Sequence, residues 1–167
     1  SVPAGQSCCM SVLWPLLHYL IDKVRLDAER DFTVYQEINR RFAAAIAKEY
    51  RPGDVIWVHD YQLALVPGYL RRLLPEAAIG FFLHVPFPSA EVFRILPWRE
   101  EILRGLLGAD LVGFHTSGYR HNFAHAAALV LGLDLGVDTI TLDDRTVRVG
   151  VYPIGIDAAS FEQAANR

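Results

Sequence analysis

The chain has 167 residues, a formal net charge of −3 at neutral pH, 52% hydrophobic residues and 21% charged residues. This length suits one domain with a substantial core, and the composition is neither that of a disordered chain nor that of a membrane protein. The slightly acidic balance, with no block of Lys and Arg, argues against a nucleic-acid partner. No charged segment followed by an apolar run opens the sequence, so no signal peptide is expected.

The only two cysteines, Cys8 and Cys9, are adjacent in the sequence. Neighbouring cysteines rarely form a disulfide with each other, because the bridge requires a particular separation and orientation of the two residues. We therefore interpret them as reduced thiols, which are usual in a cytoplasmic protein.

The predicted elements alternate between helices and strands. Residues 31–50 form a predicted helix with Asp31 as its N-cap and one apolar stripe four residues apart. The stripe consists of Val34, Ile38, Phe42 and Ile46. A strand is predicted over 55–59, followed by a helix over 61–74 that Pro67 should kink or shorten.

The second half of the chain continues this alternation. Predicted strands over 78–84 and 109–115 are almost wholly apolar, which is typical of parallel strands. The predicted helices are 90–96, 97–108 with Pro97 at its first position, and 117–133 with Ser117 as N-cap and Gly132 as its end. Residues 139–156 predict one or two strands, with a hairpin about Asp143 and Asp144, before a last helix begins at 157.

This alternation predicts an α/β fold with a doubly wound, mostly parallel sheet. Ligands of such sheets bind beyond the carboxyl ends of the strands. His59 with Asp60, His84 and His115 each follow one of three predicted strands, so parallel strands should bring them to one rim. A single His at a strand end is more often a hydrogen-bonded core residue, and Asp60 could instead cap a helix beginning at Tyr61. Their coincidence after three strands favours a ligand cleft.

Other features are weaker indicators of function. The loop "VPFPS" after His84 is stiffened by two prolines and could hold that imidazole in one orientation. Trp14, followed by Pro, could present a flat ring to a sugar face. His121 and His125 are four residues apart, but no third ligand accompanies them, so no metal site is predicted. No phosphate-binding loop, dinucleotide fingerprint or nucleophile elbow is found in the sequence.

Four stretches together resemble glycosyltransferase family 20, the trehalose-6-phosphate synthase family. They are "LWPLLHY" at 13–19, "IWVHDYQL" at 56–63, the stretch 79–116 and "VYPIGID" at 151–157. The resemblance implies the GT-B architecture, two Rossmann-like lobes with the reaction in the cleft between them. It also implies transfer of glucose from UDP-glucose to glucose 6-phosphate with retention of configuration. The expected products are α,α-trehalose 6-phosphate and UDP, with UDP-glucose as co-substrate and no metal or other cofactor.

The resemblance also implies roles for individual residues. Asp60 is expected to hydrogen-bond the acceptor sugar, and Trp14 to pack beside it and help to select its anomer. His84 is expected to lie next to the donor glucose, followed by Val85 in the cleft. Asp60 and His84 would act as positioning and electrostatic groups, since the departing phosphate is expected to take the acceptor proton.

The chain also departs from the family pattern. Residues 1–11 match poorly: Gly5 stands where the family usually has a Tyr, and Met10 where it has an Asn. We expect 12–157 to be a partial acceptor-side lobe that lacks the family's first strand, and 158–167 to begin the link to a second, absent lobe. Such a chain should be inactive alone, and its uncovered sheet edge should favour low stability or self-association, including a homo-oligomer.

Two alternatives remain open from the sequence. The first is a relative with another acceptor, such as a glucosylglycerol-phosphate synthase, because acceptor choice depends on the N-terminal segment that is altered here. The second is a non-catalytic synthase-like subunit that binds a sugar phosphate or a partner enzyme. For the leading prediction the expected partners are a sugar phosphate and a nucleotide sugar, with no nucleic acid and no membrane.

Overall fold

The computed structural model describes residues 9–155, with the side chains described from residue 11 onward. Gly5, Cys8, the predicted helix from 157 and the segment 158–167 therefore lie outside the described residues. The α-helices are α2 (Trp14–Leu17), α3 (Glu29–Glu49), α4 (Val66–Leu73), α5 (Ala90–Phe93), α6 (Arg99–Leu106) and α7 (Ser117–Leu131), with short helical turns η1 (Cys9–Leu13), η2 (Ile21–Lys23) and η3 (Tyr61–Leu63). The strands are β1 (Val55–His59), β2 (Ala78–Leu83), β3 (Leu111–Phe114), β4 (Asp134–Leu135), β5 (Thr139–Thr141) and β6 (Thr146–Val151).

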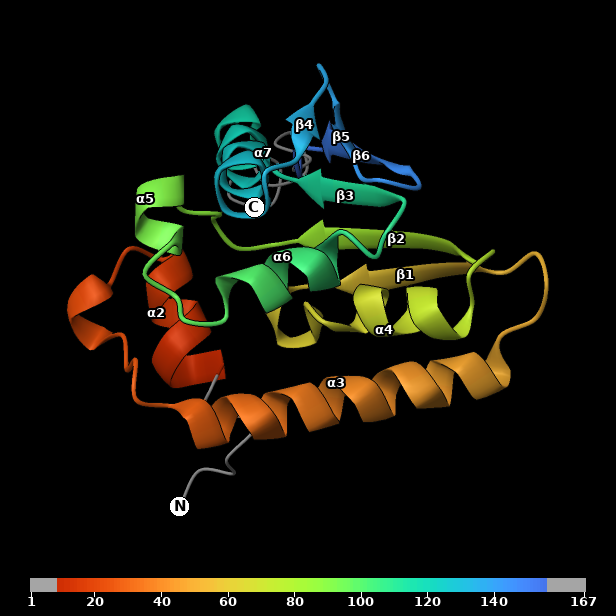
Figure 1. Cartoon of the computed structure of the whole chain (residues 1–167), viewed down its shortest axis with the longest axis horizontal. Helices are drawn as coiled ribbons and strands as arrows, with labels where there is room; N and C mark the ends of the chain where they lie inside the picture. Colours follow the sequence, from red (N-terminus) through yellow and green to blue (C-terminus); the bar gives the residue numbers. More distant parts are fainter. Residues whose placement is uncertain (1–8, 156–167) are drawn as a thin grey trace, which may run out of the picture.

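One six-stranded sheet in the order β1-β2-β3-β6-β5-β4 organises the described residues. The neighbours β1 to β2, β2 to β3 and β3 to β6 run parallel, and their arrows point the same way in Figure 1. β5 pairs antiparallel with both β4 and β6, which forms the predicted hairpin about Asp143 and Asp144. The predicted mixed α/β fold with a mostly parallel sheet is therefore confirmed.

The prediction for α3 was wrong in its cap and its buried face. The helix begins at Glu29, so Asp31 lies within its first turn and is not the N-cap residue. The buried residues are Phe32, Tyr35, Asn39 and Ala43, whereas Ile38 and Phe42 of the predicted stripe are 37% and 49% exposed. Counting only apolar residues selected the wrong stripe, because the true inner face carries the polar side chain of Asn39.

Three other helix starts also differ from the sequence prediction. Pro67 lies in the first turn of α4, so the predicted helix is shortened at this proline, as expected, and the separate turn η3 precedes it. Pro97 precedes α6, whose N-cap position is Trp98. The cap of α7 is Thr116, not Ser117: its hydroxyl accepts a hydrogen bond from the amide of Tyr119 at 3.2 Å. Gly132 ends α7 with a left-handed φ of 69°, as predicted.

The core lies between one face of the sheet and the helices. Ile56 and Val58 of β1, and Ile79 and Phe81 paired beside them on β2, are buried on this face. α4 and α6 pack closely because Gly68 of α4 meets Gly105 of α6: a Cβ on Gly68 would lie 3.0 Å from the Cα of Gly105. Figure 1 shows α4 and α6 as a layer over the strands and α3 running along the far side of α4.

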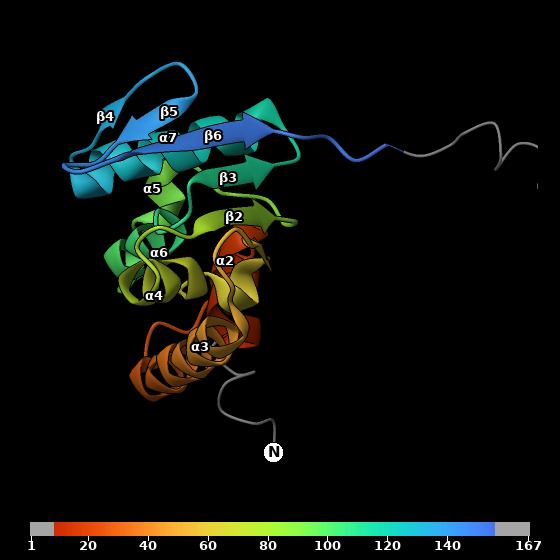
Figure 2. The ribbon, with the colours of Figure 1, turned by 90° about the vertical axis from the view of Figure 1, so that its right-hand side faces the viewer.

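Aromatic rings cover parts of the opposite face of the sheet. Trp57 of β1 is 46% exposed, and a Cβ on Gly80 would lie 2.0 Å from its ring. The Phe82 ring likewise leaves no room for a Cβ at Gly113. Phe82 is only 8% exposed, so on this face the apolar surface of β2 is shielded by rings on and beside the sheet. In Figure 2 the arrows of β2, β3 and β6 point the same way, so the carboxyl ends of these parallel strands share one edge of the sheet.

At the amino ends of the strands, two arginines bind loop backbone. Arg71 donates to the carbonyl oxygens of Pro75, Ala77 and Gly108, and forms a 2.7 Å ion pair with Asp110. Arg145 donates to Leu107 and Ala109 carbonyls close by. Desolvation, and then the neighbouring Arg71, lower the pKa of Arg145 from its usual value. These charges fix loops at the end of the sheet opposite the predicted rim.

Candidate functional site

The polar residues predicted at one rim do lie together. His59 ends β1, and its Nδ1 is 2.9 Å from Nε2 of His84, which directly follows β2. The planes of the two rings are nearly parallel, with centroids 5.1 Å apart and an interplanar angle of 22°. His115, after β3, lies with its ring centroid 5.6 Å from that of His84. Parallel pairing of β1, β2 and β3 therefore produces a row of three imidazoles.

Asp60 is fixed between the first two strands by its backbone and its carboxylate. Its amide donates to the Phe82 carbonyl at 2.8 Å, and its Oδ1 accepts from the backbone amide of His84 at 3.3 Å. It adopts φ 67° and ψ 167°, a region in which residues other than glycine are strained. Asp60 does not cap η3 through its side chain, so the predicted capping role is wrong. Strain at this residue is a feature expected of a functional site.

Helix α3 holds the backbone that follows Asp60. The Tyr35 hydroxyl donates to the Tyr61 carbonyl at 2.6 Å and accepts from the amide of Ala64 at 3.1 Å. The Asn39 amide group donates to Gln62 at 3.0 Å and its oxygen accepts from the amide of Leu65 at 3.1 Å. Two buried side chains thus hydrogen-bond four backbone groups of the segment 61–65. Sequence reasoning missed both supporting residues; their four-residue spacing on the helix was the available signal.

The segment that carries Trp14 packs against the same region. η1, just before Trp14, contacts η3, and α2 contacts α5 after the proline-containing loop. The His18 ring stacks on Trp14 with centroids 4.2 Å apart, and its Nδ1 donates to the Trp14 carbonyl at 2.8 Å. The Tyr19 hydroxyl accepts from the amide of Ser89 at 2.9 Å, which ties the segment to that loop. Trp14 is partly buried, with its ring backed by an imidazole.

The loop after His84 is anchored from below. Val85 is partly buried against the core, and Phe87 is 1% exposed. The Phe87 ring packs against Phe93, Phe114 and Phe123, and its carbonyl accepts from the Asn122 side chain at 2.9 Å. This anchoring agrees with the expectation that the loop is rigid and holds His84 and Val85 in place.

His115 differs from the other two histidines of the rim. Its Nδ1 is buried and has no hydrogen-bond partner among residues 9–155, and its ring packs edge-on against Phe82 with centroids 4.8 Å apart. A buried polar atom without a partner is costly and uncommon in native proteins. The position nevertheless agrees with the prediction that His115 belongs to the same rim.

Candidate metal ligands do not gather within residues 11–155. No group of three or more His, Cys, Asp and Glu side chains there could hold a metal ion. His121 and His125 do face each other along α7, with ring centroids 6.1 Å apart, but they form a pair without a third ligand. This pair therefore carries no metal-site assignment.

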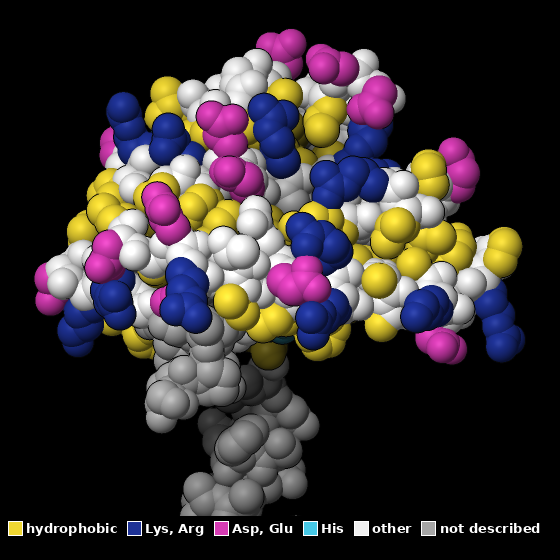
Figure 3. All heavy atoms as spheres, turned by 60° about the horizontal axis from the view of Figure 1, so that its bottom comes forward, with side chains coloured by type: hydrophobic (Ala, Val, Ile, Leu, Met, Phe, Trp, Pro, Cys, Tyr) yellow, Lys and Arg dark blue, Asp and Glu magenta, His cyan; other side chains and the backbone are white. Residues whose placement is uncertain are grey.

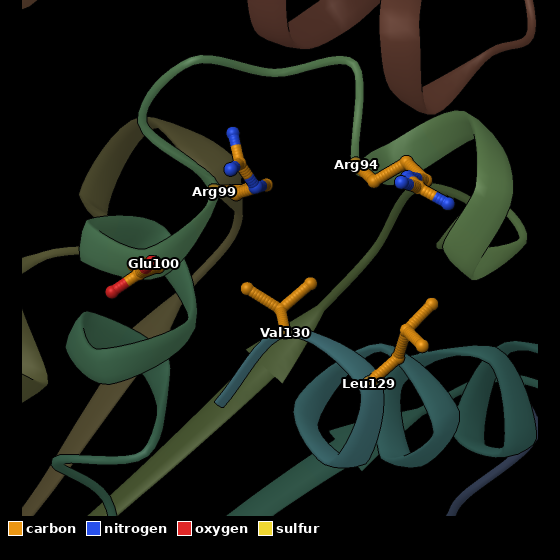
Figure 4. A pocket seen from close by; sticks show the side chains of 5 residues that line it. All are labelled: Arg94, Arg99, Glu100, Leu129 and Val130. Carbon is orange, nitrogen blue, oxygen red and sulfur yellow. The ribbon is translucent and has the colours of Figure 1, made fainter. Parts of the chain in front are cut away.

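A pocket of about 290 Å³ lies between α5, α6 and α7, away from the histidine row. Figure 4 shows that the side chains of Arg94 and Arg99, on its rim, extend in different directions and do not converge on one point. Arg99 also donates to the carbonyl of Leu96 at 3.2 Å. Two diverging guanidinium groups do not form an anion clamp, so the rim at the carboxyl ends remains the candidate site.

The charged side chains on the face shown in Figure 3 are of mixed sign. Lys and Arg alternate with Asp and Glu there, with apolar side chains between them. This face therefore lacks the basic stripe typical of nucleic-acid-binding proteins. Within residues 9–155, no helix has the length and apolar character needed to cross a membrane.

Comparison with known proteins places the chain in a family. Residues 4–167 match glycosyltransferase family 20, and the chain belongs to this family. It is 48% identical over 158 residues to an α,α-trehalose-phosphate synthase (UDP-forming) of Aspergillus niger, covering 92% of this chain and 33% of that protein. The chain therefore spans about a third of the length of this relative.

Solved structures with the same fold carry related descriptions. One is an α,α-trehalose-phosphate synthase of Burkholderia xenovorans in complex with glucose-6-phosphate, with a TM-score of 0.84, 33% identity, and coverage of 96% of this chain and 36% of that one. Another is the N-terminal domain of Candida albicans trehalose-6-phosphate phosphatase, with a TM-score of 0.84, 40% identity, and coverage of 97% and 35%. The resemblance inferred from the sequence is confirmed at the level of family and fold.

Proposed function

We propose that this chain forms the acceptor-side part of a retaining glucosyltransferase that makes α,α-trehalose 6-phosphate from UDP-glucose and glucose 6-phosphate. The observation that carries the proposal is the coupling of Asp60 to His84 at the rim, where the segment of Trp14 also packs. The names of the relatives, one of them solved with glucose-6-phosphate, support it. Residues 12–157 would form the partial lobe and 158–167 would begin the link to a second lobe.

The side chains suit these roles chemically. The Asp60 carboxylate can accept hydrogen bonds from sugar hydroxyls, which are stronger when the acceptor is charged. The Trp14 ring can pack on an apolar sugar face, and the His18 ring behind it restricts its movement. His84 would contact the donor glucose, with Val85 beside it in the cleft. Because each group is held by backbone contacts, its main contribution would be to position the reactants and stabilise developing charge.

We further propose that the isolated chain does not turn over, because it spans only about a third of the length of the relatives named as synthases. Losing the diphosphate contacts expected from a second lobe removes several charge-assisted bonds, each worth about 1.5–3 kcal/mol. The purified chain should therefore bind glucose 6-phosphate weakly and form no appreciable α,α-trehalose 6-phosphate with UDP-glucose. Measurable product would refute the inactivity.

Binding of the acceptor tests the main proposal separately. Titration of the 15N-labelled chain with glucose 6-phosphate should shift the resonances of Asp60 and of the Trp14 indole. Titration with glycerol 3-phosphate should leave them unchanged, unless the chain is a glucosylglycerol-phosphate synthase-like relative. No shift with either compound at millimolar concentration would contradict an acceptor site here.

A non-catalytic synthase-like domain is the second candidate. Its specific support is the similarity to a domain of a Candida albicans trehalose-6-phosphate phosphatase, at 40% identity. Such a domain could bind a sugar phosphate or a partner enzyme without catalysing transfer. Supplying a donor-side lobe in trans distinguishes the two: restored product formation indicates an enzyme, and binding without product indicates the non-catalytic domain.

A further inference from the structure

The contact between His59 and His84 determines which ring nitrogen of His84 is available to a ligand. Nε2 of His84 lies 2.9 Å from Nδ1 of His59 and is therefore occupied. Nδ1 of His84, on an exposed side chain, has no hydrogen-bond partner among the described residues. A sugar hydroxyl approaching this imidazole would consequently find Nδ1 and not Nε2.

We propose that His59 is a positioning residue, which fixes the tautomer and ring orientation of His84 through this hydrogen bond. The inference rests on the proposed function, since it assigns His59 to the donor-side contact of His84. In a hydrogen bond between two neutral imidazoles, one ring nitrogen donates and the other accepts. The bond therefore holds both rings in defined tautomers, as other hydrogen-bond partners of histidine do.

The arrangement favours one of the two tautomer pairs. If His84 donates through Nε2–H to the bare Nδ1 of His59, both rings adopt the Nε2–H form, which is the more stable form of a free histidine side chain. His84 then presents a bare Nδ1, which can accept the proton of a sugar hydroxyl. The reverse pair would require the less stable Nδ1–H form on both rings.

The backbone holds the two rings in register. The amide of Asp60 donates to Phe82 on one side of the pair, and the amide of His84 donates to Asp60 on the other. The Trp57 ring meets His59 edge-on, with centroids 5.8 Å apart. Movement of the His59 imidazole is thus limited on two sides, which is the condition for a side chain to position another.

Histidine-ring 15N–1H correlation spectra of the chain test this proposal directly. We expect a single tautomer at His84 and a scalar coupling between Nδ1 of His59 and Nε2 of His84. His59→Phe, which keeps a flat ring but removes the nitrogen, should leave His84 averaging between two tautomers. His59→Asn places an amide near the position of Nδ1 and should restore a single tautomer. His121→Gln, on an exposed part of α7, is the matched control and should change nothing.

The outcomes separate this inference from the proposed function. An averaged His84 ring in the wild-type chain, or an unchanged single tautomer in His59→Phe, would overturn it. A single His84 tautomer of either kind supports a positioning role for His59. The Nδ1–H form would only reverse the direction of the hydrogen bond between the two rings. If His59→Phe does not fold, the scalar coupling between the two rings in the wild-type chain and the spectrum of His59→Asn still test the proposal. Failure of glucose 6-phosphate to shift Asp60 would count against the proposed function and leave these spectra unaffected.

Discussion

The carboxylate of Asp60 accepts a hydrogen bond from the backbone amide of His84, 24 residues later in the chain, at 3.3 Å. This bond joins the ends of two neighbouring parallel strands and fixes the Asp60 carboxylate beside the backbone that carries the His84 imidazole. It exists although the backbone of Asp60 is strained, at φ 67°. Retaining such a residue, where glycine would be unstrained, agrees with the proposed sugar-binding role.

Replacing Asp60 should separate stability from ligand binding. Asp60→Gly relieves strain of about 1–3 kcal/mol but loses the bond to His84, so we expect a small net increase in the free energy of unfolding. The same variant should abolish the glucose 6-phosphate shift. Asp60→Asn keeps the side-chain shape without its charge and should weaken binding by about tenfold, or about 1.4 kcal/mol. Denaturant titration and ligand titration measure the two effects, and unchanged binding in Asp60→Gly would contradict the assignment.

Asn39 should be among the most sensitive positions of α3. Asn39→Leu removes the partner of two backbone groups of the segment after Asp60 and should cost about 1–3 kcal/mol for the groups left unsatisfied. Chemical denaturation followed by circular dichroism gives the change. The control Ala44→Ser, on the exposed side of the same helix, should stay within about 0.5 kcal/mol of wild type. Equal effects of the two substitutions would refute the supporting role.

The close approach of α4 to Gly108, just after the end of α6, predicts a strong effect of substituting this glycine. Gly108→Ala would place a Cβ 2.3 Å from the backbone of Pro67 and Gly68, which cannot rotate away as a side chain can. We expect this substitution to lower the free energy of unfolding by about 3 kcal/mol or more. Gly118→Ala, whose Cβ would meet only the Thr116 hydroxyl at 3.8 Å, should be neutral or slightly stabilising. Melting temperatures measured for the two variants compare these effects on stability.

Glu37 on α3 makes a testable contribution to the pH dependence of stability. Hydrogen bonds from Arg41 and then Arg40 lower the pKa of its exposed carboxyl group. A carboxyl group whose pKa is lower in the folded state than in the unfolded state stabilises the protein at pH values above its unfolded-state pKa. This contribution is lost as the pH falls through the folded-state pKa. Carboxyl-detected NMR should find Glu37 titrating below its usual range, and Arg41→Gln should raise that pKa. High salt should shrink the difference, because both partners are exposed.

Strand β1 is the outer parallel strand of the described sheet, and its outward side chains predict self-association. Val55 is 72% exposed and Trp57 is 46% exposed beside unpaired backbone. We expect sedimentation to show concentration-dependent association, and Val55→Lys to reduce it, since a lysine on an edge strand opposes pairing. Val137→Lys, at a residue 92% exposed in a loop, is the control. A sharp melting transition that is independent of concentration in the wild-type chain would count against this prediction.

The sequence by itself determined the order of elements, the parallel strands and the residues of the rim. β1, β2 and β3 are recognisable because short apolar runs bounded by Pro, Gly and charged residues have few other stable forms. Parallel strands put their carboxyl ends at the same edge, so the meeting of His59, Asp60, His84 and His115 followed from local pattern alone. The proline after Trp14 suggested a ring that faces a sugar, but the role of Trp14 beside the acceptor came only from the family motif.

Tertiary structure alone decided how these residues are held. The inner face of α3 includes Asn39 because backbone groups far away in the sequence need its amide, which an apolar count cannot reveal. The positive φ of Asp60 and the hydrogen bond between His59 and His84 depend on the register of β1 against β2. Local sequence sets which residues reach the sheet edge, but atomic contacts between distant segments set their orientation, because a hydrogen bond requires atoms placed to within a few tenths of an ångström.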